Sequence, residues 1–217
     1  MNVRGSLFMK RILSCGLVCL VLCLMGLAIW AKVSASVSVM GENNEYTYLA
    51  IVNRFDSPET MLNFAEGEVD KSHLDITHTV HAVLCFSRPV LLILPEGTVA
   101  EEDCSYVGAR VTFDKPFDTF LDHNGFEIPT IPFGAILEPK RVEIVGDIVY
   151  GVVVESNENY IILDARDESA QPTGIHSRYS ITPDTLIWYK EPFQPGSGCE
   201  AIVDKDGAVL AMQEANG

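Results

Sequence analysis

Residues 73–85 read His-Leu-Asp-Ile-Thr-His-Thr-Val-His-Ala-Val-Leu-Cys, and this stretch decides the fold class that the sequence predicts. Apolar side chains occupy every second position through most of it, and threonine, histidine and aspartate fill the positions between. Such alternation places one face of a β-strand against a core and the other in water. The β-branched residues also favour a strand over a helix. We therefore expect a strand with His78 packed on the apolar face and with His73 and His81 exposed.

The chain from residue 46 onward repeats this pattern of short apolar runs separated by turn residues. Ser57-Pro58-Glu59-Thr60 interrupts it, because a serine N-cap followed by proline predicts a short helix that ends near Gly67. Thr98 and Glu101 form a capping box for a second short helix. The pattern favours an all-β barrel or sandwich over alternating βα units. The predicted strands are 46–53, 89–94, 109–113, 128–137, 141–145, 148–154, 160–163, 179–181, 185–189, 201–203 and 208–212.

Four segments near the C-terminus resemble the small OB-like β-barrel domains of uncharacterised bacterial exported proteins and lipoproteins. They are residues 151–155, 159–164, 185–188 and the hairpin 200–212, so the resemblance covers about residues 147–213. A looser version covers residues 46–145. The resemblance implies a mainly β fold, with one or two small OB-like β-barrels after an N-terminal hydrophobic helix. It implies no particular activity, because OB-like domains bind many kinds of ligand.

Two features depart from the pattern of these domains. Residues 164–178 form a long polar insert, and no clear helix precedes Cys199. Closure of the barrel is therefore the least supported part of the predicted fold.

Residues 12–30 form nineteen consecutive uncharged, mostly apolar positions, preceded by three basic residues. As a helix they would span roughly 28 Å, close to the thickness of a bilayer's hydrocarbon core. Val33 and Ala35 also fit a signal-peptidase site. Cleavage after Ala35 and retention as a single-pass anchor are both open. In either case the basic flank holds the N-terminus in the cytoplasm and places residues 36–217 outside.

These predictions divide the chain into three parts. Residues 1–35 are a signal peptide or membrane anchor, and residues 36–145 are a β-rich domain with short helices. A shift in composition at Gly146-Asp147 marks the start of an OB-like β-barrel domain, residues 146–217.

The exported part is strongly acidic. Residues 1–35 contain four of the 15 basic residues and none of the 30 acidic ones, which leaves 11 basic against 30 acidic residues and a net charge of about −19. Nucleic-acid binding is not expected, because it requires clustered positive charge to displace phosphate counterions. Acidity of this kind keeps an exported domain soluble. Recruitment of cations or basic partners is the alternative.

Three cysteines follow the hydrophobic segment, namely Cys85, Cys104 and Cys199. An odd number excludes a complete intramolecular disulfide framework, although Cys85 and Cys104 could form a bridge in an oxidising compartment. A metal site at His73, His78 and His81 is not expected. On one strand His73 and His81 would be roughly 26 Å apart, with His78 on the opposite face.

The remaining candidate motifs are explained more simply by structural roles than by catalysis, metal binding or ligand binding. Residues 204–207 contain a fragment of a calcium loop without the full ligand series, so we expect a hairpin turn. Gly196-Ser197-Gly198 is not a nucleophile elbow and is expected to be a loop. Trp188, Tyr189 and Phe193 are expected to fill a core, with a ligand-binding aromatic face as the alternative. No catalytic, cofactor-binding or metal-ligating residue is assigned, and no cofactor is expected.

The sequence therefore predicts a non-catalytic binding or accessory module outside the cytoplasm, secreted or anchored through residues 12–30. One alternative is an exported hydrolase whose acidic site is assembled only in three dimensions. A second alternative is a single-pass membrane-tethered sensor or assembly partner. The protein or small-molecule partner is not identified at this stage.

Overall fold

The structure is a computed structural model that describes residues 38–40, 45–65, 71–98, 100, 104–121, 127–166, 171–188 and 193–215. All of them belong to the second of two compact units of the chain, Val37–Gly217. The hydrophobic segment 12–30 and the cleavage region around Ala35 lie outside the described residues. Within the described ranges, no helix combines the length and the apolar character that crossing a bilayer requires.

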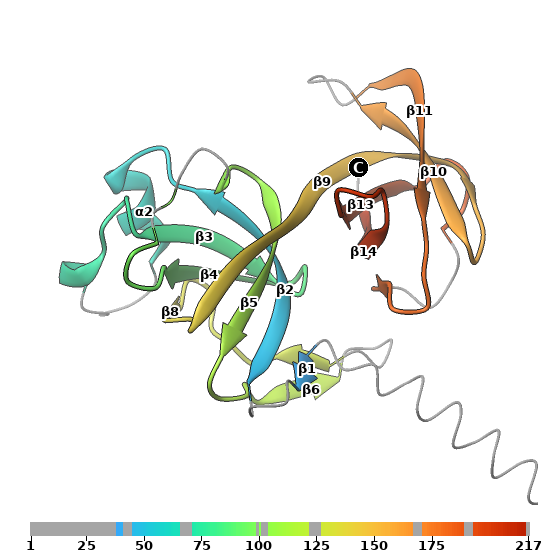
Figure 1. Cartoon of the computed structure of the whole chain (residues 1–217). Helices are drawn as coiled ribbons and strands as arrows, with labels where there is room; N and C mark the ends of the chain where they lie inside the picture. The colour runs from blue at the N-terminus through green and yellow to red at the C-terminus, as the bar shows by residue number, and fades with distance from the viewer. Residues whose placement is uncertain are drawn as a thin grey trace, which may run out of the picture. The chain divides into compact units, whose positions relative to one another are not determined.

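The described part of the chain is mainly β, as predicted, with one α-helix (Figure 1). The helix is α2 (Pro58–Phe64), and a single 3-10 turn spans Lys71–His73. The strands are β1 (Ser38–Met40), β2 (Tyr46–Arg54), β3 (Thr79–Leu84), β4 (Arg88–Ile93), β5 (Val107–Phe113), β6 (Thr119–Leu121), β7 (Glu127–Pro129), β8 (Ile136–Leu137), β9 (Arg141–Ser156), β10 (Tyr160–Arg166), β11 (Pro172–Ser180), β12 (Leu186–Ile187), β13 (Gly198–Val203) and β14 (Val209–Ala215).

Twelve of these strands form one mixed sheet, in the order β12-β14-β13-β9-β5-β2-β3-β4-β8. β1 pairs with β2, and the β10–β11 hairpin is attached to β9. Two short pairs, β4–β8 and β12–β14, are parallel, and the other pairs of this sheet are antiparallel. β6 and β7 form a separate two-stranded sheet.

The long strand β9 joins the two halves of this sheet (Figure 1). Its residues 141–147 pair with β5, residues 147–152 pair with β13, and residues 151–156 pair with β10. Where β9 passes from the first partner to the second, Gly108 pairs with Gly146 and Ala109 pairs with Ile144. One extra residue, Val145, is therefore accommodated as a β-bulge, a feature that bends a strand and increases its twist.

Glycine is required at this bend because β13 approaches β5 and β9 closely. A Cβ atom on Gly146 would lie 2.1 Å from the backbone oxygen of Val203. A Cβ atom on Gly108 would lie 2.2 Å from Cγ2 of Ile202. The predicted domain boundary at Gly146-Asp147 thus falls inside a continuous strand. The division of the chain into two β domains at that point stays a prediction.

Two hydrophobic cores lie on either side of the bend. The first is built mainly from one face of β2, β3, β4 and β5, and it includes Val52, Leu84 and Leu92, none of which has any exposed surface. The second is built from β9, β10, β13 and β14 around Val153, Leu163 and Met212. A smaller cluster packs α2 against the opposite face of β4, with Met61 next to Leu91 in the same cluster.

The stretch 73–85 is only partly the strand that its alternation predicts. β3 begins at Thr79, because a turn at residues 76–78 ends the regular pattern before it. Asp75 fixes this turn by accepting hydrogen bonds from the backbone N–H and the hydroxyl of Thr77, both at 2.8 Å. The predicted roles of two histidines are therefore wrong: His78 has a 45% exposed side chain, whereas His81 is half-buried. The side chain of His73 lies outside the described residues.

Other local predictions are confirmed or corrected in the same way. α2 begins as expected, with Ser57 as N-cap accepting a hydrogen bond from the backbone of Thr60 at 3.2 Å, but it ends at Phe64 rather than near Gly67. The predicted strand 128–137 is divided into β7 and β8 by a turn that contains Gly134. The predicted strands 141–145 and 148–154 are one strand, β9. Most of the helix predicted after Thr98 lies outside the described residues.

We predict that Gly146→Ala lowers the free energy of unfolding by about 3 kcal/mol, because a backbone atom of β13 must move to admit the methyl group. The matched control is Gly174→Ala on β11, where an added Cβ meets no atom within 4 Å. The remaining cost, about 1 kcal/mol, comes from placing alanine at the positive φ of 74°. Urea denaturation of the full-length protein in detergent micelles measures both, and equal losses would contradict the close approach described above.

Candidate functional site

A groove with mixed polar and apolar lining lies against the face of β2 and β3 that points away from the first core. Ile51 stands opposite Val83 in the β2–β3 register, and Asn53 stands opposite His81. Alternation along each strand places these four side chains on one face, since Val52 and Ala82 point into the core. The groove therefore has an apolar floor at Ile51 and Val83, with a carboxamide and an imidazole beside it.

The other side of the groove comes from β13, β14 and the residue that precedes β5. Glu200 on β13 and Gln213 on β14 are direct cross-strand partners, and Tyr106 completes the lining. The space lined by these residues is partly open to solvent and has a volume of about 290 Å³. Ligand pockets usually measure about 300–1,000 Å³, so this groove suits a small ligand.

Glu200 is the centre of a hydrogen-bond network inside the groove. The phenol of Tyr106 donates to one carboxylate oxygen, and Nε2 of Gln213 donates to the other at 2.6 Å. Both donors are neutral, so they orient the carboxylate without neutralising its charge. Burial and the hydrogen bond to Glu200 raise the pKa of Tyr106, which keeps this phenol protonated.

Tyr106, which donates to Glu200, has an unusual backbone conformation. Its φ is +56°, in the left-handed region that bulky side chains rarely occupy. Conformations of this kind cost about 1–3 kcal/mol and are found most often at functional sites. The strain at Tyr106 is therefore independent support for a functional role of this groove.

His81 is the second notable group of the groove. Its ring packs edge-on against Phe64 of α2, with 4.5 Å between ring centroids. Burial lowers the pKa of His81, so the imidazole is neutral at neutral pH. Among the described residues, no hydrogen-bond partner faces its buried Nε2 atom. A buried polar atom without a partner is costly, and because this Nε2 has almost no accessible surface, a ligand in the groove does not reach it in this structure.

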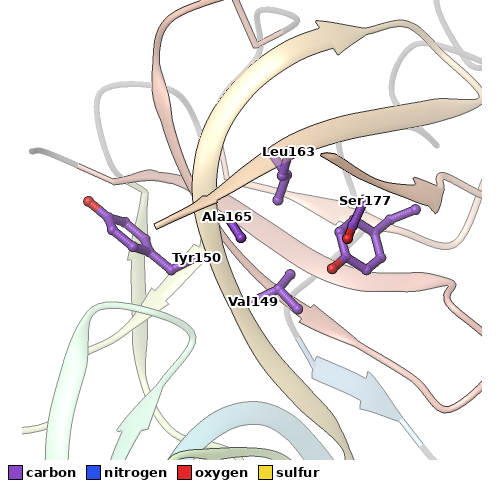
Figure 2. Close-up of a pocket in the computed structure, with 6 residues that line it drawn as sticks. Val149, Tyr150, Leu163, Ala165 and Ser177 are labelled. Atoms are coloured by element: carbon purple, nitrogen blue, oxygen red, sulfur yellow. The ribbon is translucent and has the colours of Figure 1, made fainter. Parts of the chain in front are cut away.

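A second hollow opens beside the second core, between β9, β10 and β11 (Figure 2). It has a volume of about 170 Å³, and none of the residues that line it in the described part is charged. Figure 2 shows Val149, Leu163, Ala165 and Ser177 around it, with Tyr150 directed away from them. We interpret this hollow as the loosely filled end of a core, because it is smaller than ligand pockets usually are and no charged residue is among the described residues that line it.

Among the described residues, no cysteine lines either pocket. Cys85 is a free thiol in the first core, so the bridge to Cys104 that the sequence left open is not formed. Burial raises the pKa of Cys85 well above its usual range and raises that of Cys199 to about 12. Buried protonated thiols of this kind are poor nucleophiles.

The other candidates have the structural roles that the sequence predicts. Asp204 caps the β13–β14 hairpin by accepting from the backbone of Asp206 and of Ala208, each at 2.9 Å. Ser197 donates to the backbone oxygen of Gln194 within a turn. Trp188 and Phe193 are buried in the two cores, whereas Tyr189 lies outside the described residues. In the described ranges, no three His, Cys, Asp or Glu side chains come together as metal ligands.

Sequence reasoning did not assign Tyr106, Glu200 or Gln213 to any site. They come from two segments about 94 positions apart, and only the bend in β9 brings those segments together. The one available signal was the position of Asn53 and Glu200 within otherwise apolar strand sequences.

Comparison of the chain with protein-family models, with curated proteins and with solved structures found no match. The function is therefore inferred from the groove's own residues.

We predict that His81 makes stability depend on pH. An unfolded histidine titrates near about pH 6.5, and the folded pKa of His81 is lower. Between the two values the unfolded state binds more protons, so the free energy of unfolding falls as the pH falls from about 6.5 towards the folded pKa. Urea denaturation of the full-length protein at several pH values above about 5 measures this slope, and His81→Gln should reduce it.

The matched control for this measurement is His176→Gln. The His176 side chain is 52% exposed, and its Nε2 lies 3.7 Å from a carboxylate oxygen of Asp164. Because this side chain is not buried, its replacement tests whether the effect of His81→Gln comes from burial. The burial described for His81 would be contradicted if the two variants had the same effect.

Proposed function

We propose that this protein is a non-catalytic binding module that acts outside the cytoplasm and holds a small ligand in the groove between β2–β3 and β13–β14. The observation that carries this proposal is the convergence of Asn53, His81, Tyr106, Glu200 and Gln213 over an apolar floor. Few, well-oriented polar groups on an apolar surface are typical of ligand sites. The strained backbone of Tyr106 supports the same assignment.

Binding is favoured over hydrolysis because the groove has an incomplete set of catalytic groups. Its lining in the described residues contains one carboxylate, that of Glu200, and neither serine nor cysteine. A hydrolase of the kind considered as an alternative requires a second carboxylate or an activated nucleophile. The neutral His81 and the hydrogen-bonded Glu200 are better suited to orienting a ligand.

We also propose two OB-like barrels and a membrane-directing role for the N-terminal segment. We propose that β9, β10, β13 and β14 form the greater part of an OB-like barrel around the second core. The bulge in β9 and its shared pairing support a strongly bent sheet. A similar barrel is proposed around the first core. Residues 12–30 are proposed to direct the protein across the membrane and, if they are not cleaved, to anchor it there.

The binding proposal is tested by nuclear magnetic resonance on the full-length, ¹⁵N-labelled protein in detergent micelles. The side-chain amides of Asn53 and Gln213 line the groove and report on its occupancy. We expect members of a small-fragment library to shift these two signals. The side-chain amides of Asn157 and Asn159 lie in the exposed β9–β10 turn and are internal controls. A library that shifts none of the groove signals would overturn the proposal.

The location is tested by fractionation followed by N-terminal sequencing. We predict that the chain is recovered outside the cytoplasm, either beginning at Ser36 or intact and associated with membrane. The first result identifies a secreted module, and the second supports the membrane-tethered alternative. Recovery of the intact chain from cytosol, without lipid, would contradict the proposed location.

A further inference from the structure

We propose that the groove selects a primary alkylammonium group, with the ammonium bound near Glu200 and Asn53 and the alkyl chain over Ile51 and Val83. This inference deepens the binding function proposed above and rests on it. It names a class of ligand that the groove's charge and hydrogen-bonding groups favour.

The charge of the groove favours a cation. The two hydrogen-bond donors of Glu200, Tyr106 and Gln213, are both neutral, so neither places a positive charge beside the carboxylate. No lysine or arginine is among the described residues that line the groove. A partly buried carboxylate without a positive partner attracts a cation more strongly than a fully hydrated one does, because water screens it less.

Two arginines on neighbouring strands lie outside the groove lining. Arg54, which follows Asn53 on β2, donates to the hydroxyl of Ser105 at 3.2 Å. Arg110 on β5 stands opposite Glu143 in the β5–β9 register. Neither is part of the groove lining, so neither supplies the counter-charge that Glu200 lacks.

The hydrogen-bonding groups suit an ammonium group in particular. An ammonium has three N–H donors and no acceptor, so it needs several acceptors that converge from different directions. The groove lining offers the carboxylate of Glu200 and the side-chain amide oxygens of Asn53 and Gln213.

The apolar floor explains why the ligand should carry a short alkyl chain. Ile51 and Val83 lie opposite each other on adjacent strands, beside Asn53 and His81. A chain of a few carbon atoms would cover them and remove apolar surface from water. A small hydrated ion would leave this part of the groove unused.

The test compares four probes in titrations of the full-length protein, followed through the side-chain amides of Asn53 and Gln213. The probes are n-butylammonium, methylammonium, butyrate and n-butanol. We expect n-butylammonium to bind at least tenfold more tightly than butyrate or butanol. Methylammonium should bind at least about tenfold more weakly than n-butylammonium, because it lacks three methylene groups. Butyrate or butanol binding within threefold of n-butylammonium would overturn the proposal.

The role of Glu200 is tested with Glu200→Gln, which keeps an oxygen acceptor for Tyr106 and removes the charge. We expect the Kd for n-butylammonium to rise at least fivefold and to approach that for butanol. The matched control, Glu158→Gln, removes the same charge from the exposed β9–β10 turn and should leave the Kd unchanged. The comparison of probes on the unmodified protein keeps the proposal testable if Glu200→Gln fails to fold.

A fifth probe distinguishes the two sources of an alkylammonium group. Nα-acetyl-lysine N-methylamide presents the ammonium as it occurs on a protein side chain. Tighter binding of this compound than of n-butylammonium would indicate a lysine of a partner protein, and the reverse order would indicate a free amine. If neutral fragments bind in the groove and no amine does, the proposed ligand class is wrong. The proposed binding function is then still supported. If no probe or fragment binds, both fail.

Discussion

The structure depends on one strand that belongs to both halves of the sheet. β9 completes the pairing of β5 with its first seven residues and carries β13 and β10 on the remainder. The bulge at Val145 lets it change direction, and the absence of a side chain at Gly146 lets β13 approach. A strand shared in this way fixes the first and second cores to each other more firmly than a flexible linker would.

The groove is a consequence of that arrangement. The outer faces of β2–β3 and of β13–β14 carry polar side chains within otherwise apolar strands, and the bend brings these faces opposite each other. Tyr106 and Glu200 then form a hydrogen bond across the groove. Neither half of the sheet could bind a ligand here alone, because each contributes only some of the polar groups. An acidic protein with one uncompensated carboxylate in a partly apolar groove is suited to a small amphiphilic cation.

The sequence predicts the class of fold better than it predicts the site. Alternation of apolar residues is a local property, so it identifies most of the strands and the start of α2 correctly. It fails at residues 73–78, where the hydrogen bonds of Asp75 to Thr77 form a turn that the apolar pattern does not reveal. It also places a boundary at Gly146-Asp147, because glycine followed by aspartate is typical of turns as well as of bulges. The groove depends on pairing between distant segments, which no local pattern specifies.

The shared strand also bears on the order in which the protein folds. A chain made from its N-terminus presents β2, β3, β4 and β5 well before residues 141–147 exist. Until those residues arrive, the outer edge of β5 has unpaired backbone groups that invite association with other chains. The edge strand of the first core, β5, is therefore unprotected until residues 141–147 have been synthesised. A nascent chain with this topology benefits from a chaperone that binds the unpaired edge, or from rapid folding beyond the point at which β5 is an edge strand.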